Sequence, residues 1–159
     1  MIKRVNPKTV YLIEGDAHDQ DGECRRINRI LSRHEIDVAF VGIGENGHLA
    51  FNDPPADFEV DDPYIIVKLD EICRTQQLGE GWFSSLDEVP HMAISMSIKQ
   101  IMRSNQIVCV VPDRRKQQGI YKTLAGEISQ LNPASILRKH KYTYLYLDDE
   151  AAELVKDLL

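Results

Sequence analysis

The stretch DVAFVGIGENGH, residues 37–48, joins an almost continuously apolar run to a glycine-rich turn. Apolar residues that do not alternate with polar ones are typical of a parallel strand covered on both faces. Gly42, Gly44 and Gly47 then fit the pattern G-x-G-x-x-G, which turns a strand sharply and lets a ligand approach the backbone. Because ligands of open α/β sheets bind beyond the carboxyl ends of the strands, this turn predicts a binding site.

Apolar runs of strand length alternate with segments of helical period along the rest of the chain. Strands are predicted at 10–13, 37–44, 64–69, 107–111 and 142–147. Helices are predicted at 20–34, 114–128 and 151–159, the second with Asp113 as its N-cap. This alternation predicts one α/β domain over residues 1–159, with three layers and a mostly parallel, Rossmann-like sheet.

The composition is that of a globular protein and argues against several classes of partner. Hydrophobic residues make up 43% of the chain and the net charge is -6, so the basic face that nucleic acid requires is not expected. No apolar run has the length of a membrane span or the character of a signal peptide. Three cysteines without a C-x-x-C pair predict reduced thiols in a cytoplasmic protein, with Cys109 buried and inert.

A dinucleotide site is one interpretation of the glycine pattern, but the following residues disfavour it. Such a site needs a helix that begins near Gly47 and an acidic residue roughly 20 positions further on. Pro54 leaves room for barely one helical turn, and Asp70 opens a polar helical stretch. Dinucleotide binding is therefore the weaker hypothesis.

His48 gives this turn its acid–base chemistry. An imidazole titrates near neutral pH, so beside a crevice it can take up a proton and return it. Asn46 and Asp53 lie two and five residues away, close enough to fix the tautomer and stabilise an imidazolium. A lone loop histidine is more often only a hydrogen-bonded residue, but the convergence of glycines, amide and carboxylate favours a catalytic role.

The stretch NGHLAFNDP, residues 46–54, resembles the signature G-[DN]-G-H-[IL]-x-F-N-E-P of the glucosamine-6-phosphate deaminase/isomerase family. Asp53 stands where that family has glutamate. The similarity continues collinearly through residues 11–17, 89–111 and 133–152, and in the second of these it implies a strand and a short helix before the next strand. The related 6-phosphogluconolactonases share the glycine–histidine part alone and come second.

This resemblance implies a sugar-phosphate enzyme that uses no metal and no other cofactor. Family members open the ring of an amino-sugar 6-phosphate, move a proton between C2 and C1, and release ammonia to leave fructose 6-phosphate. The resemblance places the acid–base histidine on His48 and a phosphate-binding lysine on Lys116, where a helix N-terminus would favour an anion. The implied site comprises catalytic His48, Asp53 and Asn46, and substrate-binding Gly44, Gly47 and Lys116.

Two features of the family do not occur in this sequence. The usual phosphate-binding arginine aligns near Gly81, so Arg74, Arg114 and Arg115 are the candidates to replace it, and Trp82 is expected in the core or a sub-site wall. The N-terminal strand, the glycine-rich phosphate loop and the enolising aspartate also have no counterpart. The resemblance thus implies the C-terminal two-thirds of the enzyme, with a sheet truncated on its N-terminal side.

Three functions remain open besides the dinucleotide site. The first is an incomplete amino-sugar-phosphate isomerase/deaminase, the second a non-catalytic sugar-phosphate-binding module, and the third a 6-phosphogluconolactonase-like hydrolase. A truncated parallel sheet exposes apolar surface and unpaired backbone. We therefore expect the chain to self-associate or to take its missing strands from a partner chain, with no nucleic acid and no membrane as partner.

Overall fold

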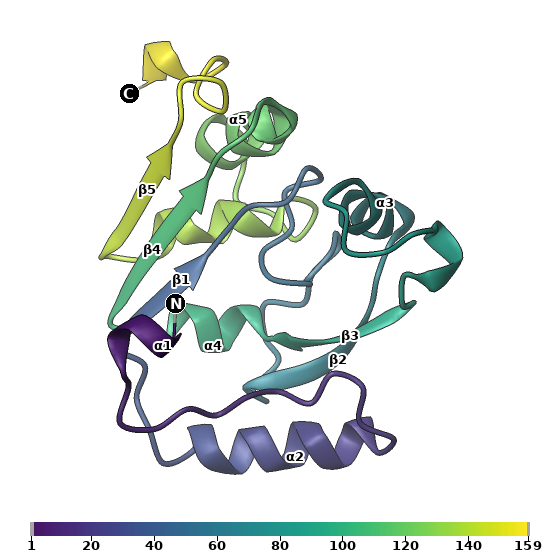
Figure 1. Ribbon diagram of the computed structural model, residues 1–159. Helices are drawn as coiled ribbons and strands as arrows, with labels where there is room; N and C mark the ends of the chain where they lie inside the picture. The colour runs from purple at the N-terminus through teal and green to yellow at the C-terminus, as the bar shows by residue number, and fades with distance from the viewer. Residues whose placement is uncertain (1, 159) are drawn as a thin grey trace.

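A parallel three-stranded sheet is the larger of two sheets in the computed structural model, which describes residues 2–158 (Figure 1). Its strands are β1 (Val38–Val41), β4 (Gln106–Val111) and β5 (Thr143–Leu147), in the order β1-β4-β5. The middle strand β4 pairs in parallel with both neighbours, so β1 and β5 form the edges of this sheet. All three strands coincide with predicted apolar runs, and the α/β class with a parallel sheet is confirmed.

A second sheet is separate from the first and has two strands. It pairs β2 (Tyr64–Lys68) antiparallel with β3 (Met92–Met96). The strand predicted at 64–69 is confirmed, but it lies outside the parallel sheet. β3 and the following helix α4 (Ile98–Met102) are the strand and short helix that the family resemblance implied before β4.

Two of the helices begin at aspartate caps. The side chain of Asp19 caps α2 (Gln20–Leu31) and that of Asp70 caps α3 (Glu71–Gly79), each by accepting a hydrogen bond from a backbone N–H of the first turn. Such caps satisfy N–H groups that have no partner inside the helix. α2 confirms the helix predicted over 20–34 except for its last three residues, and it packs against β2 below the small sheet in Figure 1.

The helix predicted over 114–128 consists of two parts. A 3₁₀ turn, η2 (Arg114–Lys116), leads into α5 (Gln117–Ala125). The carboxylate of Asp113 accepts a hydrogen bond from the Arg115 N–H at 2.9 Å, so the predicted cap is confirmed for the 3₁₀ turn. Because η2 follows β4 almost directly, it lies at the carboxyl end of the parallel sheet.

Two other predicted elements are wrong. Residues 10–13 form no strand: all four are exposed, and the Leu12 carbonyl accepts a hydrogen bond from Arg26 at 2.7 Å rather than from a neighbouring strand. Over the described part of 151–159 the backbone forms turns rather than an α-helix, although Ala151 and Val155 are buried as an apolar helix face would be. The remaining short elements are α1 (Ile2–Val5), η1 (Leu86–Glu88), η3 (Pro133–Lys139) and η4 (Lys156–Leu158).

The hydrophobic core lies on one face of the parallel sheet. β4 buries Ile107, Cys109 and Val111 on this face, opposite residues of α4, α5 and η3. Burial raises the pKa of the Cys109 thiol to about 12, so the prediction of a buried, inert cysteine is confirmed. No helix in residues 2–158 is long and apolar enough to cross a lipid bilayer.

The opposite face of the parallel sheet is open. Phe40 of β1 is 78% exposed, and Val110, Tyr144 and Tyr146 are about half exposed. The expectation that residues 37–44 would be covered on both faces therefore holds for one face only.

Candidate active site

A glycine turn follows β1 and carries His48 beyond the carboxyl end of the sheet. Gly47 has a φ of 83°, the left-handed conformation that glycine adopts without a steric penalty. The Gly44 N–H donates to the His48 carbonyl and the Gly47 N–H donates to the Gly44 carbonyl, both at 3.0 Å. Asn46 Oδ1 also accepts a hydrogen bond from the His48 N–H at 3.0 Å. These bonds fix the direction in which the imidazole leaves the backbone.

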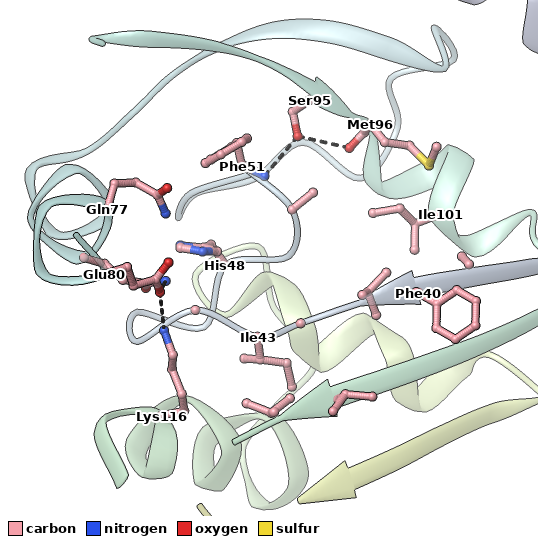
Figure 2. A pocket seen from close by; sticks show the side chains of 18 of the residues that line it. Phe40, Ile43, His48, Phe51, Gln77, Glu80, Ser95, Met96, Ile101 and Lys116 are labelled. Atoms are coloured by element: carbon pink, nitrogen blue, oxygen red, sulfur yellow. Dashed lines mark hydrogen bonds and ion pairs between the residues drawn. The ribbon is translucent and has the colours of Figure 1, made fainter. Parts of the chain in front are cut away.

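The His48 ring lies directly against Gly44 and lines a cavity of about 750 Å³ (Figure 2). The side chain is largely buried, at 6% exposure. A Cβ atom added to Gly44 would lie 2.2–2.4 Å from three atoms of the ring, which is far inside van der Waals contact. Gly44 is therefore required so that the imidazole can occupy this position.

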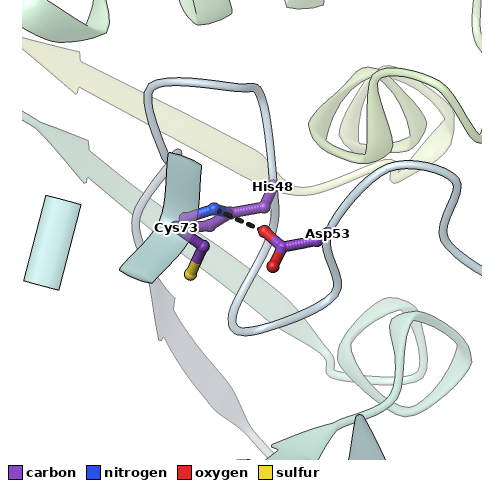
Figure 3. A group of neighbouring side chains, drawn as sticks. All are labelled: His48, Asp53 and Cys73. Carbon is purple, nitrogen blue, oxygen red and sulfur yellow. Dashed lines mark ion pairs between the residues drawn. The ribbon is translucent and has the colours of Figure 1, made fainter. Parts of the chain in front are cut away.

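Asp53 holds the other side of the imidazole. Its Oδ1 lies 3.1 Å from His48 Nδ1 (Figure 3), although the N–H direction falls outside the range for a well-formed hydrogen bond. Asp53 Oδ1 is nevertheless the nearest charged group to Nδ1 in this contact. Burial alone would raise the pKa of Asp53, but the His48 ring, the Asp70 N–H and the Asn46 amide together lower it. Asp53 is thus held as a carboxylate next to the imidazole.

Asn46 supports the site through the carboxylates rather than through the imidazole. Its Nδ2 donates to Asp53 Oδ1 at 3.1 Å and to Asp70 Oδ2 at 3.0 Å. The Asp70 N–H in turn donates to Asp53 Oδ2 at 2.9 Å. In the sequence analysis, Asp70 entered only the disfavoured dinucleotide hypothesis. Asp70 lies at the start of α3 and caps it, but it is 17 residues from Asp53, so the sequence did not indicate that the two are neighbours.

Lys116 reaches the same cavity from the start of α5. It is 8% exposed, and its Nζ lies 3.6 Å from Glu80 Oε1 (Figure 2). Burial would raise the pKa of Glu80, but hydrogen bonds from Gln76 and Trp82 and the nearby Lys116 lower it. The structure therefore places Lys116 with His48 at one cavity, as expected, and adds a carboxylate beside it that the sequence did not indicate.

The three candidate arginines differ in where they lie. Arg115 lines the cavity, where it pairs with Asp113 at 2.6 Å and approaches Glu45 at 3.5 Å. Arg74 donates to backbone carbonyls of the loop after α3, so its guanidinium is used within the fold. Arg114 does not line the cavity. Arg115 is the one candidate of the three that could contact a cavity ligand.

Trp82 is neither in the core nor in the cavity wall. It is 72% exposed, and it does not line the cavity. The expectation of a core or sub-site role is therefore wrong. Gly81, directly before it, has a φ of 80° and ends the helical stretch, which turns the following side chain outward.

A contact that the sequence did not reveal fixes the glycine turn from the side of α5. A Cβ on Gly119 of α5 would lie 2.7 Å from the Gly44 carbonyl oxygen. A Cβ on Gly47 would lie 1.9 Å from Asn132 Oδ1. The turn is therefore packed so closely that its position depends on residues far away in the sequence.

Comparison with known proteins gives clear relatives. No protein-family model matches the chain. Over 152 residues it is 38% identical to a glucosamine-6-phosphate deaminase of Clostridium acetobutylicum, which covers 95% of this chain and 61% of the relative. A glucosamine-6-phosphate deaminase of Streptococcus pyogenes serotype M1 is 39% identical over 145 residues, covering 91% and 60%. The chain thus spans about three fifths of the length of these curated relatives.

Solved structures show the same fold. A monomeric glucosamine-6-phosphate deaminase superposes with a TM-score of 0.82 at 35% identity, covering 91% of this chain and 58% of that one. A 6-phosphogluconolactonase from Trypanosoma brucei superposes with a TM-score of 0.66 at 16% identity, covering 94% and 57%. The second likeness is one of fold alone.

Proposed function

Because the chain is a homologue of the glucosamine-6-phosphate deaminases over about three fifths of their length, we propose that it carries the ring-opening part of an amino-sugar-phosphate isomerase/deaminase site. The complete reaction would convert glucosamine 6-phosphate to fructose 6-phosphate and ammonia. The observation that supports this proposal is the position of His48. Its ring is buried on a glycine turn, contacts Asp53 on one side and lines the cavity that also contains Lys116.

Ring opening requires one proton to move from the anomeric hydroxyl to the ring oxygen. Since Nδ1 of His48 faces Asp53, Nε2 is the ring nitrogen left for the substrate. Nε2 takes the hydroxyl proton as the C1–O1 bond becomes a carbonyl, and it returns that proton to the ring oxygen as the C1–O5 bond breaks. The Asp53 carboxylate stabilises the imidazolium that exists between these two transfers.

Lys116 is the proposed phosphate contact. It immediately precedes α5, so its ammonium group acts together with the N-terminal N–H groups of that helix. Glu80 pairs with Lys116 in the structure, and a phosphate would replace the carboxylate as the partner of the ammonium group. The carboxylate therefore weakens the affinity of this site for an anion.

We propose that the isolated chain performs only part of this reaction, because we assign none of residues 2–158 to the role of the family's enolising aspartate. We therefore expect the chain to bind glucosamine 6-phosphate and open its ring without releasing ammonia. Binding without accelerated ring opening would instead support the non-catalytic sugar-phosphate-binding module.

Isothermal calorimetry tests the binding half of this proposal. The chain is expected to bind glucosamine 6-phosphate and fructose 6-phosphate, and to give no heat with NAD. Lys116→Gln should weaken binding of the sugar phosphate about 10- to 100-fold, because a charge-assisted hydrogen bond contributes about 1.5–3 kcal/mol. Arg114→Gln removes the same charge from an exposed position in the same turn and is the matched control. Heat with NAD alone would favour the dinucleotide hypothesis.

Self-association through the open face of the parallel sheet is the second part of the proposal. The exposed side chains of Phe40, Val110 and Tyr144 form an apolar surface, and β1 leaves one edge without a strand partner. Surfaces of this kind bind another polypeptide or aggregate. In a purified sample the polypeptide available is a second copy of the chain.

Light scattering at increasing concentration measures this association. The chain is expected to exceed the mass of a monomer, and Phe40→Lys to restore the monomer by placing a charge at the centre of the apolar surface. Trp82→Lys is the matched control, since it removes an aromatic side chain of similar exposure that lies outside the sheet. A monomeric wild-type chain at high concentration would contradict the proposal.

A cytoplasmic location is proposed from the state of the cysteines. Cys24, Cys73 and Cys109 are all free and buried. Unpaired thiols are typical of proteins from reducing compartments, and the relatives named above are enzymes of sugar-phosphate metabolism by their names.

A further inference from the structure

Cys73 lies beside His48 and Asp53, and the proposed chemistry does not use it. Its Sγ, a ring nitrogen of His48 and a carboxylate oxygen of Asp53 all lie within 4.8 Å of one another (Figure 3). Cys73 is fully buried and the Asp53 side chain is 5% exposed. The cluster joins residues of two segments, because Cys73 comes from the first turn of α3 and the other two come from the glycine turn and the residues after it.

One polar atom of this cluster lacks a hydrogen-bond partner. His48 Nδ1 is buried and makes no well-formed hydrogen bond, even though Asp53 Oδ1 is 3.1 Å away. Buried polar atoms in folded proteins are nearly always bonded, so an exception requires an explanation. A metal ion bound to Nδ1 would provide one, with the ring proton then carried on Nε2, the nitrogen that the proposed ring opening needs unprotonated.

We propose that His48, Asp53 and Cys73 form a binding site for Zn²⁺ or a similar borderline-soft divalent cation, and that the bound metal inhibits the enzyme by occupying the imidazole. Imidazole nitrogen, thiolate sulfur and carboxylate oxygen are the donors that Zn²⁺ prefers, whereas Mg²⁺ and Ca²⁺ prefer oxygen alone. Binding itself does not depend on the proposed function, but the inhibition does.

The spacing of the three donors suits such a cation. Bonds of about 2.0–2.3 Å place the ligands of a tetrahedral zinc ion roughly 3.5 Å apart. Donor atoms within 4.8 Å of one another would therefore need to approach by only about 1 Å. Three protein ligands leave the fourth position to a water molecule.

The thiol would change its protonation state when the metal binds. Burial, followed by the negative charges of Asp53 and Asp70, raises the pKa of the Cys73 thiol to about 12. Cys73 is therefore a neutral thiol and a poor nucleophile without a metal. When Zn²⁺ binds, the S–H proton leaves to solvent and the sulfur bonds to the metal as a thiolate, which the added positive charge stabilises.

Cobalt(II) is the probe for this site, because Zn²⁺ has no absorption of its own. The purified chain is expected to bind one Co²⁺ with the visible d–d bands of a tetrahedral site and a sulfur-to-cobalt charge-transfer band in the near ultraviolet. Zn²⁺ should abolish both the d–d bands and the charge-transfer band, because it replaces Co²⁺ at the same site. Cys73→Ala and Cys73→Ser should lose the charge-transfer band, while Cys24→Ala and Cys109→Ala, which alter the other buried cysteines, should keep it.

Two results would overturn the metal site. One is a wild-type chain without a charge-transfer band, and the other is a band that persists in both Cys73 variants. Circular dichroism shows whether each variant is folded. Two substitutions are made at position 73 so that the test still holds if one of the two variants does not fold.

Inhibition is measured separately as the effect of Zn²⁺ on ring opening. Zn²⁺ should slow ring opening by the wild-type chain and have little effect on ring opening by Cys73→Ser, which keeps His48 and Asp53. Metal binding without inhibition would contradict the inhibitory role. If the wild-type chain does not accelerate ring opening, the proposed function is contradicted. The cobalt spectrum would still show whether the metal site exists.

Discussion

Replacing His48 by alanine is expected to slow ring opening of glucosamine 6-phosphate by ~10²–10⁴-fold, the usual contribution of a positioned acid–base group. The reason is that His48 is the one histidine among the described residues that line the cavity. The other ionisable side chains there are carboxylates, a guanidinium, an ammonium and a phenol, residue types that do not ordinarily exchange protons near neutral pH. The rate is measured as exchange between the two anomers of the sugar by NMR magnetisation transfer, a reading that does not require ammonia release.

The control for this substitution is a second histidine. His18 is exposed and does not line the cavity, so His18→Ala should leave the exchange rate at the wild-type value. Binding of the sugar phosphate to His48→Ala should persist, because Lys116 is unchanged. If His48→Ala exchanges the two anomers at the wild-type rate, His48 is not the acid–base residue of ring opening.

Gly44→Ala is expected to slow ring opening almost as much as the loss of the imidazole, although His48 is retained. The new Cβ would lie 2.2–2.4 Å from the ring atoms, so the ring must leave its position against the turn. The His48 ring then loses the 3.1 Å contact with Asp53 and no longer lines the cavity. Forcing an extra methyl group into a packed site also costs about 1–3 kcal/mol of unfolding free energy. Anomer exchange and urea denaturation measure the two effects.

Gly42→Ala is the matched control for this substitution. A Cβ on Gly42 would meet only the Val110 carbonyl oxygen, at an ordinary contact distance of 3.6 Å. This variant should keep both the exchange rate and the stability within a small margin of the wild-type chain. A folded Gly44→Ala variant with wild-type exchange would show that the position of the ring does not matter for the reaction.

The candidate site could be predicted in part because three of its residues are close in sequence. Asn46, His48 and Asp53 fall within one turn and its exit, and the structure joins them in one cluster of contacts. Lys116 required the family resemblance, since nothing in its own segment distinguishes it from a solvated lysine. Asp70 and Glu80 were not predicted as site residues at all.

The fold was predictable to a similar degree. The strands over 37–44, 107–111 and 142–147 were identified from apolar runs, because a buried strand requires apolar side chains wherever it lies. The run at 10–13 shows the limit of this argument. It has the composition of a strand, but none of the strands described in residues 2–158 pairs with it.

The sequence by itself determined the local order of this site: a strand that ends in a glycine turn and the imidazole that follows it. Such features depend on the φ and ψ preferences of adjacent residues, which the sequence states directly. Only the tertiary structure decided that Cys73 and Asp70 lie next to Asp53, that Glu80 pairs with Lys116, and that one face of the sheet stays open. Those contacts join segments far apart along the chain, and their distances follow from how helices and sheets pack rather than from the residues between them.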